Sequence, residues 1–190
     1  MARPREFDED RVVTAAMETF WRHGYEGTST RELCESTGLN PSSLYNAFGG
    51  KRRLYLRALH RYHETSTGEQ IALLRQPGPA RERLRRMMIH AIDADLDDGP
   101  GCFAVNAAVE AGATDPEVRA AVRRSFDRVE DELYAVLTTG QRTGEIPAGR
   151  DARTLARQVQ STYYGLRVLS RVSTDRQALV ATVELTLAQL

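Results

Sequence analysis

The amino-acid sequence predicts an all-α protein of about nine helices. Along most of its 190 residues, apolar side chains recur at intervals of three and four, which places them on one face of a helix. Two stretches begin with the pattern of a capping box, Ser29 with Glu32 and Thr174 with Gln177. Glycine and proline interrupt the chain between helical stretches, most clearly at residues 76–79, which read Gln-Pro-Gly-Pro. Together these features favour a succession of amphipathic helices.

The composition is typical of a globular protein that folds in water. Apolar residues make up 41% of the chain and charged residues 27%. The 26 basic and 26 acidic side chains give a formal net charge of zero, so any attraction to nucleic acid must come from a local group of charges. No apolar stretch has the length of a membrane span, and the first residues lack a signal-peptide core, so we expect a cytoplasmic protein with no membrane partner. Cys34 and Cys102 are too few for a disulfide framework and are expected to be reduced.

The chain opens with a polar arm and a first helix. The arm, residues 1–6, carries Arg3 and Arg5, and it could fray or reach into the minor groove of DNA. Residues 7–23 have apolar side chains at helical spacing, and Gly24 is expected to end this helix. We expect the helix to brace the two that follow, through Val12, Val13, Ala16, Met17 and Phe20.

Residues 28–51 predict two short helices joined by a tight turn. The capping box starts the first helix near Thr30, and Gly38 can take the positive φ that follows a last helical turn. Asn40 then caps the second helix, and Pro41 occupies its first position, where a missing N–H costs nothing. Two helices joined by a short turn that contains glycine are typical of a DNA-reading helix-turn-helix.

The second helix of this corner has one apolar side and other sides covered by short polar groups. Leu44 and Phe48 lie four residues apart and can face a core. The serine, asparagine and tyrosine side chains around them can bond to phosphates and base edges without holding the helix out of a major groove. Lys51 begins a basic run that reaches Arg61 without an acidic residue, and because a cation opposes the dipole at a helix start, a DNA phosphate would suit Lys51. We predict DNA contacts from Thr30, Asn40, Pro41, Ser42, Ser43, Tyr45, Asn46 and Lys51.

The spacing of the residues alone would also allow a purely structural helical corner with a solvated basic face. The N-terminal third, however, resembles a known family. The residues that carry the resemblance read Phe20-x-x-x-Gly24-Tyr25-x-x-Thr28-Ser29 and Leu39-Asn40-Pro41-Ser42-Ser43-Leu44-Tyr45-x-x-Phe48-x-x-Lys51-x-x-Leu54. They are similar to the N-terminal domain of the TetR family of transcriptional regulators, without a gap from about residue 7 to residue 59.

The resemblance implies two domains with different functions. Residues 1–50 would form a helix-turn-helix DNA-binding domain, and residues 51–190 an effector-binding and dimerisation domain. The protein would then bind a palindromic, double-stranded DNA operator as a homodimer. It would act as a repressor that an unidentified small-molecule effector releases.

The middle of the chain is expected to begin with one long helix, residues 51–74. It starts at the predicted DNA surface and ends at the break in residues 76–79, and the resemblance implies that it acts as a lever. His60, His63 and Glu64 lie within one turn of each other, but two histidines without a third and fourth ligand are more typical of a helix surface. We therefore predict no metal site.

The helices that follow are expected to line an effector pocket. Residues 80–96 form an amphipathic helix with a methionine pair, which could fill the core or adapt to a variable ligand. A short apolar helix with one amide begins at Cys102, and small-molecule pockets combine apolar walls with few polar groups. Cys102 could be a buried structural cysteine or a reactive thiol at a helix N-terminus. The predicted pocket residues are Met88, Cys102, Phe103, Asn106, Phe126 and Tyr163.

Three amphipathic helices complete the chain. They cover about residues 115–140, residues 152–172 and a last stretch that opens at Thr174. The last two have more apolar surface than a single domain can bury, and in TetR-like proteins this pair makes a four-helix dimer interface. The residues predicted for that interface are Leu155, Val159, Leu166, Leu179, Val183 and Leu187.

An enzyme and a redox sensor are the alternatives to a ligand-responsive regulator. His90 and Cys102 could be a base and a thiol, but they flank a Gly-Pro-Gly loop and no third group is evident to orient the histidine. The sequence has no phosphate-binding loop, dinucleotide fingerprint or zinc-protease motif. We therefore predict neither catalysis nor a cofactor. Redox sensing through Cys102 would keep DNA binding but replace the small-molecule ligand.

Overall fold

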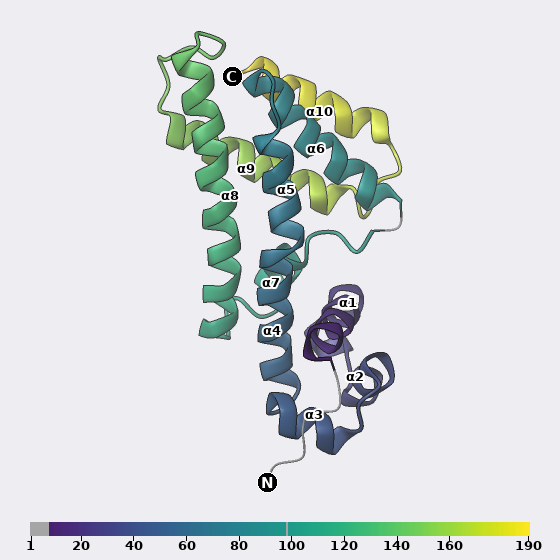
Figure 1. Ribbon diagram of the computed structural model, residues 1–190. Helices are drawn as coiled ribbons and strands as arrows, with labels where there is room; N and C mark the ends of the chain where they lie inside the picture. The colour runs from purple at the N-terminus through teal and green to yellow at the C-terminus, as the bar shows by residue number, and fades with distance from the viewer. Residues whose placement is uncertain (1–7, 98) are drawn as a thin grey trace. The chain divides into compact units, whose positions relative to one another are not determined.

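The computed structural model describes residues 8–97 and 99–190, and all regular secondary structure in these ranges is α-helical, which confirms the predicted fold class (Figure 1). Arg3 and Arg5 of the basic arm, and Asp98, lie outside the described residues. No helix in the two ranges combines the length and the apolarity needed to cross a bilayer. The helices are α1 (Glu9–Gly27), α2 (Thr30–Thr37), α3 (Pro41–Phe48), α4 (Lys51–Glu64), α5 (Ser66–Arg75), α6 (Ala80–Leu96), α7 (Phe103–Glu110), α8 (Pro116–Arg142), α9 (Ala152–Leu169) and α10 (Arg176–Ala188).

These ten described segments exceed the predicted number by one, because the expected long helix is divided at Thr65. The N–H and the hydroxyl of Thr65 both donate to the Arg61 carbonyl, at 2.9 Å each, and Thr65 has φ −86° and ψ −80°. A threonine that bonds back to the preceding turn tends to bend a helix. Regular hydrogen bonding therefore ends at Glu64 and starts again at Ser66.

The chain folds into two compact units. Unit 1 comprises Met1–Thr65 and Phe103–Val122, and unit 2 comprises Ser66–Cys102 and Arg123–Leu190. The chain thus passes from one unit to the other three times, and the last passage lies within α8. The predicted boundary between residues 50 and 51 divides the chain by function rather than by compactness, and it stays a prediction.

Unit 1 is built on α1. The predicted apolar residues of α1 are all buried, and the helix packs against α2, α4 and α7. Gly24, at φ 75°, interrupts the helix as expected, but residues 25–27 add a further helical turn after the kink. Aromatic rings fill the space between these helices: the ring centroid of Phe103 lies 5.6 Å from that of Tyr55 and 5.7 Å from that of Tyr62. Burial of such rings is the main source of stability for a unit of this size.

Unit 2 encloses a second core, formed mainly by α6, α8, α9 and α10. The six residues predicted for the dimer interface all belong to this core and are at most 5% exposed. Side chains covered by their own chain offer little surface to a second one, so this burial argues against these six residues as the dimer interface. Helical periodicity identified a buried face, and this face packs within a single chain. The six residues are Leu155, Val159, Leu166, Leu179, Val183 and Leu187.

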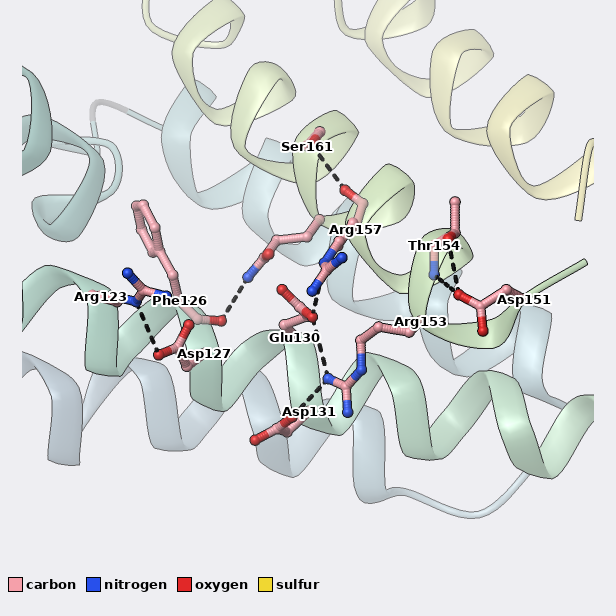
Figure 2. Close-up of polar contacts among 11 residues, drawn as sticks. Arg123, Phe126, Asp127, Glu130, Asp131, Asp151, Arg153, Thr154, Arg157 and Ser161 are labelled. Atoms are coloured by element: carbon pink, nitrogen blue, oxygen red, sulfur yellow. Dashed lines mark hydrogen bonds and ion pairs between the residues drawn. The ribbon is translucent and has the colours of Figure 1, made fainter.

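Polar contacts join α8 to α9, as Figure 2 shows. The Arg153 guanidinium lies 3.2 Å from Glu130 and 2.7 Å from Asp131. Arg157 reaches the same Glu130 oxygen at 3.2 Å. Asp151 caps the first turn of α9 with its carboxylate. These contacts link α8 to the first turns of α9 within unit 2.

Candidate nucleic-acid interface

The corner formed by α2 and α3 has the caps that the sequence predicts. The Ser29 hydroxyl accepts the Glu32 N–H at 3.1 Å, and the Glu32 carboxylate accepts the Ser29 N–H at 2.6 Å. Gly38, at φ 74°, ends α2 and donates its N–H to the Cys34 carbonyl at 2.9 Å. Thr30 follows the cap and is exposed. Hydrogen bonds within the corner therefore fix the direction in which α3 leaves it.

The second helix of the corner, α3, presents the side chains that the sequence predicts on its outer surface. The Asn40 side-chain oxygen accepts the Ser43 N–H at 2.8 Å, which leaves the Asn40 amide nitrogen for another partner. Leu44 and Phe48 are buried, at 1% and 6% exposed. Tyr45, by contrast, is 67% exposed. Pro41, Ser42 and Asn46 are also exposed, and Ser43 is half-buried.

The basic run after α3 divides into paired and unpaired cations. Lys51 and Arg53 form no ion pair within residues 8–97 and 99–190. The other three basic residues bind carboxylates of unit 1: Arg52 binds Asp115 and Glu117, Arg57 binds Glu9, and Arg61 binds Asp10. The cations left for an external anion are therefore concentrated at the start of α4.

The first turn of α4 is itself suited to an anion. Gly50 precedes it with φ 108°, and no side chain caps the free N–H groups of this turn. Backbone N–H groups and the helix dipole favour a phosphate at such a position. The Lys51 ammonium lies 4.4 Å from the centroid of the Tyr25 ring, in a cation–π contact.

Hydrogen bonds lower the pKa of two carboxylates in unit 1. Arg52 lowers the pKa of the Asp115 carboxyl from 3.8 to about 2 through direct hydrogen bonds, and the Val118 and Glu117 N–H groups add to this effect. The backbone and the hydroxyl of Ser29 lower the pKa of Glu32. Both carboxylates are therefore ionised at neutral pH and serve as structural acceptors.

The predicted pocket residues are shared between the two units. Phe103 and Asn106 belong to unit 1, and the Phe103 ring packs in the aromatic cluster described above. Met88, Cys102, Phe126 and Tyr163 belong to unit 2. Each unit is described by itself, so a pocket that contains all six residues stays a prediction.

The part of the predicted pocket in unit 2 contains aromatic rings next to a buried ion pair. The Phe126 ring centroid lies 4.5 Å from that of Tyr164. Burial raises the pKa of Tyr163 to about 12, against a lowering effect of the nearby Arg167, and Cys102 raises it further. Cys102 itself is only 4% exposed. Apolar walls with a few polar groups are typical of small-molecule sites.

Arg167 forms the buried ion pair with Asp95. Its Nε and Nη2 atoms lie 2.8 and 2.7 Å from the two carboxylate oxygens, and the side chains are 8% and 1% exposed. Arg167 Nη2 also donates to the Gly101 carbonyl at 2.7 Å. The pair therefore holds the loop that leads into Cys102.

The predicted histidine pair on α4 gives no sign of a ligand cluster. His60 Nδ1 lies 3.6 Å from Glu64, one turn further along the helix. No group of three potential metal ligands occurs in the part of the chain that the structure describes.

Sequence reasoning missed three residues near the predicted DNA surface. The Tyr25 ring contacts the Lys51 ammonium, and Glu110 accepts a hydrogen bond from the Tyr25 backbone N–H. Arg53 lies next to Gly49 and has no ion-pair partner in the described ranges. Tyr25 stands in the motif quoted above, so the motif could have pointed to it. The contact of Glu110 with residues 25 and 26 spans 84 to 85 positions, and no local pattern reports such a pairing.

The chain matches a known family along most of its length. Residues 12–58 match "Bacterial regulatory proteins, tetR family", and residues 80–185 match "Tetracyclin repressor-like, C-terminal domain". The first match covers the corner formed by α2 and α3, and the second covers most of unit 2.

Individual relatives agree with the family match. The chain is 31% identical over its whole length to the uncharacterized HTH-type transcriptional regulator YezE of Bacillus subtilis, which is also covered completely. It is 28% identical to the HTH-type transcriptional repressor ComR of Escherichia coli, over 94% of this chain and 86% of ComR. Among solved structures, a cysteine mutant of the TetR family transcriptional regulator CifR complexed with 26-base-pair operator DNA has a TM-score of 0.86 and 30% identity, over 98% of each chain.

Proposed function

The chain belongs to the TetR family of bacterial regulatory proteins and is a DNA-binding transcriptional regulator, and we propose that it is a repressor that binds a palindromic operator as a homodimer and is released by a small molecule. The relatives are transcriptional regulators rather than enzymes. The observation that carries the proposal is the exposed polar surface of α3, with Tyr45 67% exposed beside the uncapped start of α4.

The DNA contacts follow from this surface. We propose that α3 enters the major groove, where Ser42, Tyr45 and Asn46 can reach base edges or the nearby backbone. Lys51 and the first N–H groups of α4 would bind one phosphate, because no carboxylate of the described chain forms an ion pair with Lys51. In support, CifR was solved with operator DNA.

We propose a dimer interface on the solvent side of α9 and α10 in place of the six buried residues predicted from the sequence. Both helices carry an exposed stripe of apolar and small side chains at helical spacing. Val168, Leu169 and Leu185 within these stripes are 52%, 51% and 61% exposed. Exposed apolar surface of this kind is typical of a protein–protein interface. The stripes are Ser161, Gly165, Val168 and Leu169 on α9, and Ala178, Ala181, Thr182 and Leu185 on α10.

Two recognition helices in one dimer would read two half-sites separated by whole turns of DNA. We propose that an effector bound in the ligand-binding part of the chain favours a conformation whose recognition helices do not match this spacing. An effector acts only through a difference in affinity for the two conformations. A compound that binds tightly and leaves operator affinity unchanged would therefore not be the effector.

Cys102 separates a ligand mechanism from a redox mechanism. Its thiol is 4% exposed, so an oxidant could reach it only after the surrounding residues move. This burial favours a bound ligand over direct oxidation. Operator release by peroxide should therefore be equal in the parent and in Cys102→Ser, and loss of release in the variant alone would establish redox sensing.

The test of the proposal is selection of bound fragments from the protein's own genome, followed by sequencing. We expect enrichment of one short palindromic sequence, with binding that weakens steeply as salt is raised. Enrichment without a common sequence would contradict sequence-specific regulation. A common sequence without two-fold symmetry would contradict the homodimer and keep the DNA-binding assignment.

A further inference from the structure

We infer that Tyr25 and Glu110 position the ammonium group of Lys51 for its DNA phosphate. The inference rests on the proposed role of Lys51 and adds two residues, one of them on α7, far from the recognition helix in sequence. Neither residue needs to touch DNA. Both act by setting the position of the Lys51 ammonium group and by restricting the rotamers of the Lys51 side chain.

The first step is the contact between Glu110 and the kink in α1. The two Glu110 carboxylate oxygens accept the Tyr25 N–H at 2.8 Å and the Glu26 N–H at 2.7 Å. Gly24 breaks the helix just before these two groups, so they lack the partners that an unbroken helix would supply. Glu110 therefore caps the last turn of α1 from a distant part of the chain, with charge-assisted hydrogen bonds.

Both the approach of Glu110 and the backbone conformation favour glycine at position 24. A Cβ atom there would lie 3.0 Å from both carboxylate oxygens, and the backbone has φ 75°, which L side chains rarely adopt. Glu110 is the final residue of segment 101–110, which reads Gly-Cys-Phe-x-Val-Asn-x-x-x-Glu, and this contact gives it a structural role. Glu110 thus has a defined binding position in unit 1, at the N–H groups of Tyr25 and Glu26.

The second step is the Tyr25 ring. Its centroid lies 4.9 Å from that of Tyr55 and 6.3 Å from that of Phe20, so aromatic neighbours hold the ring in place. Lys51 Nζ lies 4.4 Å from the same centroid. Glu110 fixes the Tyr25 backbone, the neighbouring rings fix the Tyr25 side chain, and the ring attracts the ammonium group.

The residue after Lys51 is anchored by the same part of unit 1. Arg52 binds Asp115 at 2.8 Å and Glu117 at 3.3 Å. The segment 110–117 therefore holds both Tyr25 and the first turn of α4. A lysine held in this way loses less rotamer freedom when it binds a phosphate than a freely moving one does.

The experiment compares operator affinity over a range of salt for the parent, Lys51→Ala, Tyr25→Leu and Glu110→Gln. Lys51→Ala should weaken binding and reduce the salt slope by about one ion per protomer. Tyr25→Leu should lower affinity roughly two- to fivefold per protomer, the range of a cation–π contact, and reduce the slope in the same direction. Glu110→Gln should act likewise but less strongly, because the neutral amide offers only one acceptor oxygen.

Two controls separate positioning from a general effect on folding. Tyr25→Phe keeps the ring and should bind like the parent, and Glu69→Gln changes an exposed glutamate of unit 2 and should also bind like the parent. Combined with Lys51→Ala, the Tyr25 and Glu110 substitutions should cause no further loss, because the group they position is already absent.

The outcomes distinguish this inference from the proposed function. If Lys51→Ala changes neither affinity nor slope, the phosphate contact itself is refuted, and the inference with it. If Lys51→Ala weakens binding while Tyr25→Leu and Glu110→Gln add their full losses in that background, DNA binding through Lys51 stands and the positioning role is overturned. The positioning role would also be overturned if the salt slopes of Tyr25→Leu and Glu110→Gln both stayed at the parent value.

Discussion

Asn40 combines two tasks that different substitutions can separate. Its side-chain oxygen caps α3 through the Ser43 N–H at 2.8 Å, and its exposed position lies at the end of the helix that we expect in the groove. Asn40→Ala should lower the free energy of unfolding by about 1 kcal/mol, the usual cost of a lost cap. Asn40→Asp keeps a cap of equal quality but brings a negative charge toward DNA.

We therefore predict that Asn40→Asp unfolds at the same denaturant concentration as the parent and binds operator at least tenfold more weakly. Chemical unfolding and fluorescence anisotropy of labelled operator measure the two effects. Parent-like operator affinity in Asn40→Asp would place this side chain away from the DNA backbone.

The ion pair of Asp95 and Arg167 should be the most sensitive polar contact of unit 2. Removing one member of a buried pair leaves an uncompensated charge, which typically costs about 3–5 kcal/mol. Asp95→Ala should therefore lower the melting temperature by roughly 10 °C, as measured by circular dichroism.

Asp93 provides a matched control on the same helix. It pairs with Arg176 at 2.7 Å, but the two side chains are 47% and 54% exposed. Asp93→Ala should cost at most about 1 kcal/mol, because water replaces the lost partner. Equal losses in the two variants would mean that Asp95 is hydrated in solution.

Caps could be predicted from the sequence at the level of single residues, whereas long-range pairs could not. Ser29, Gly38 and Asn40 act on residues at most four positions away, so their roles follow from local patterns. Asp95 and Arg167 are 72 positions apart, and nothing in either neighbourhood identifies the other. The cation–π contact of Lys51 with Tyr25 is likewise set by the packing of α1 against α4.

Among the helices, α4 illustrates how a basic run acquires two roles. The sequence contains five cations between Lys51 and Arg61, which suggests a single positive surface. In the structure three of them bind carboxylates and brace α4 within unit 1. Spacing along a helix predicts which side chains share a face, but the acids that meet this face come from other parts of the chain.

The same limit applies to α9 and α10. Both helices have two faces with apolar residues: Leu166 is 2% exposed, while Leu169, three positions later, is 51% exposed. Periodicity detects each face, but it does not tell which one meets the core of its own chain. The sequence predicts the larger leucine and valine stripe as the interface, and that stripe is buried within the chain.

The pair that anchors the start of α4 should make stability depend on pH. Arg52 lowers the pKa of Asp115 from 3.8 to about 2, so the folded state binds this proton less readily than the unfolded chain. The stabilisation is present above pH 3.8 and is lost as the pH falls toward 2.

Asp115→Asn isolates this effect, since asparagine can still cap α8. The difference in unfolding free energy between parent and variant should be constant from about pH 7 to pH 5 and shrink below about pH 4. Urea unfolding at a series of pH values measures it. A difference that persists undiminished in acid would show that the contribution of Asp115 does not depend on its charge.

At the scale of the whole molecule, the path of the chain has a functional consequence. Residues 103–122 belong to unit 1, yet the residues on both sides of them in sequence belong to unit 2. This segment contains Glu110 and Asp115, which hold Tyr25 and Arg52. We therefore expect that a rearrangement in unit 2 can reach the residues proposed to contact DNA through the covalent chain.

The proposed dimer is a property of the whole molecule, and it would place two recognition helices on one operator. Leu185→Glu places a charge in the exposed apolar stripe of α10, where Leu185 is 61% exposed, so the folded chain should tolerate it. We predict a monomer in analytical ultracentrifugation at micromolar concentration, with an unchanged helical spectrum. Thr138→Glu adds the same charge to an exposed position of α8 and should leave the dimer intact. A stable Leu185→Glu dimer would mean that the chains associate through another surface.

The most direct test of the account is the operator affinity of Tyr45→Ala. Tyr45 is the most exposed aromatic residue of the proposed reading surface, so its removal should not disturb the fold. We predict that the dissociation constant for the selected operator rises roughly 5- to 100-fold, as expected for a lost contact of about 1–3 kcal/mol. Tyr134→Ala, in unit 2, should bind like the parent. Parent-like operator binding by Tyr45→Ala would contradict the central claim that α3 reads the DNA.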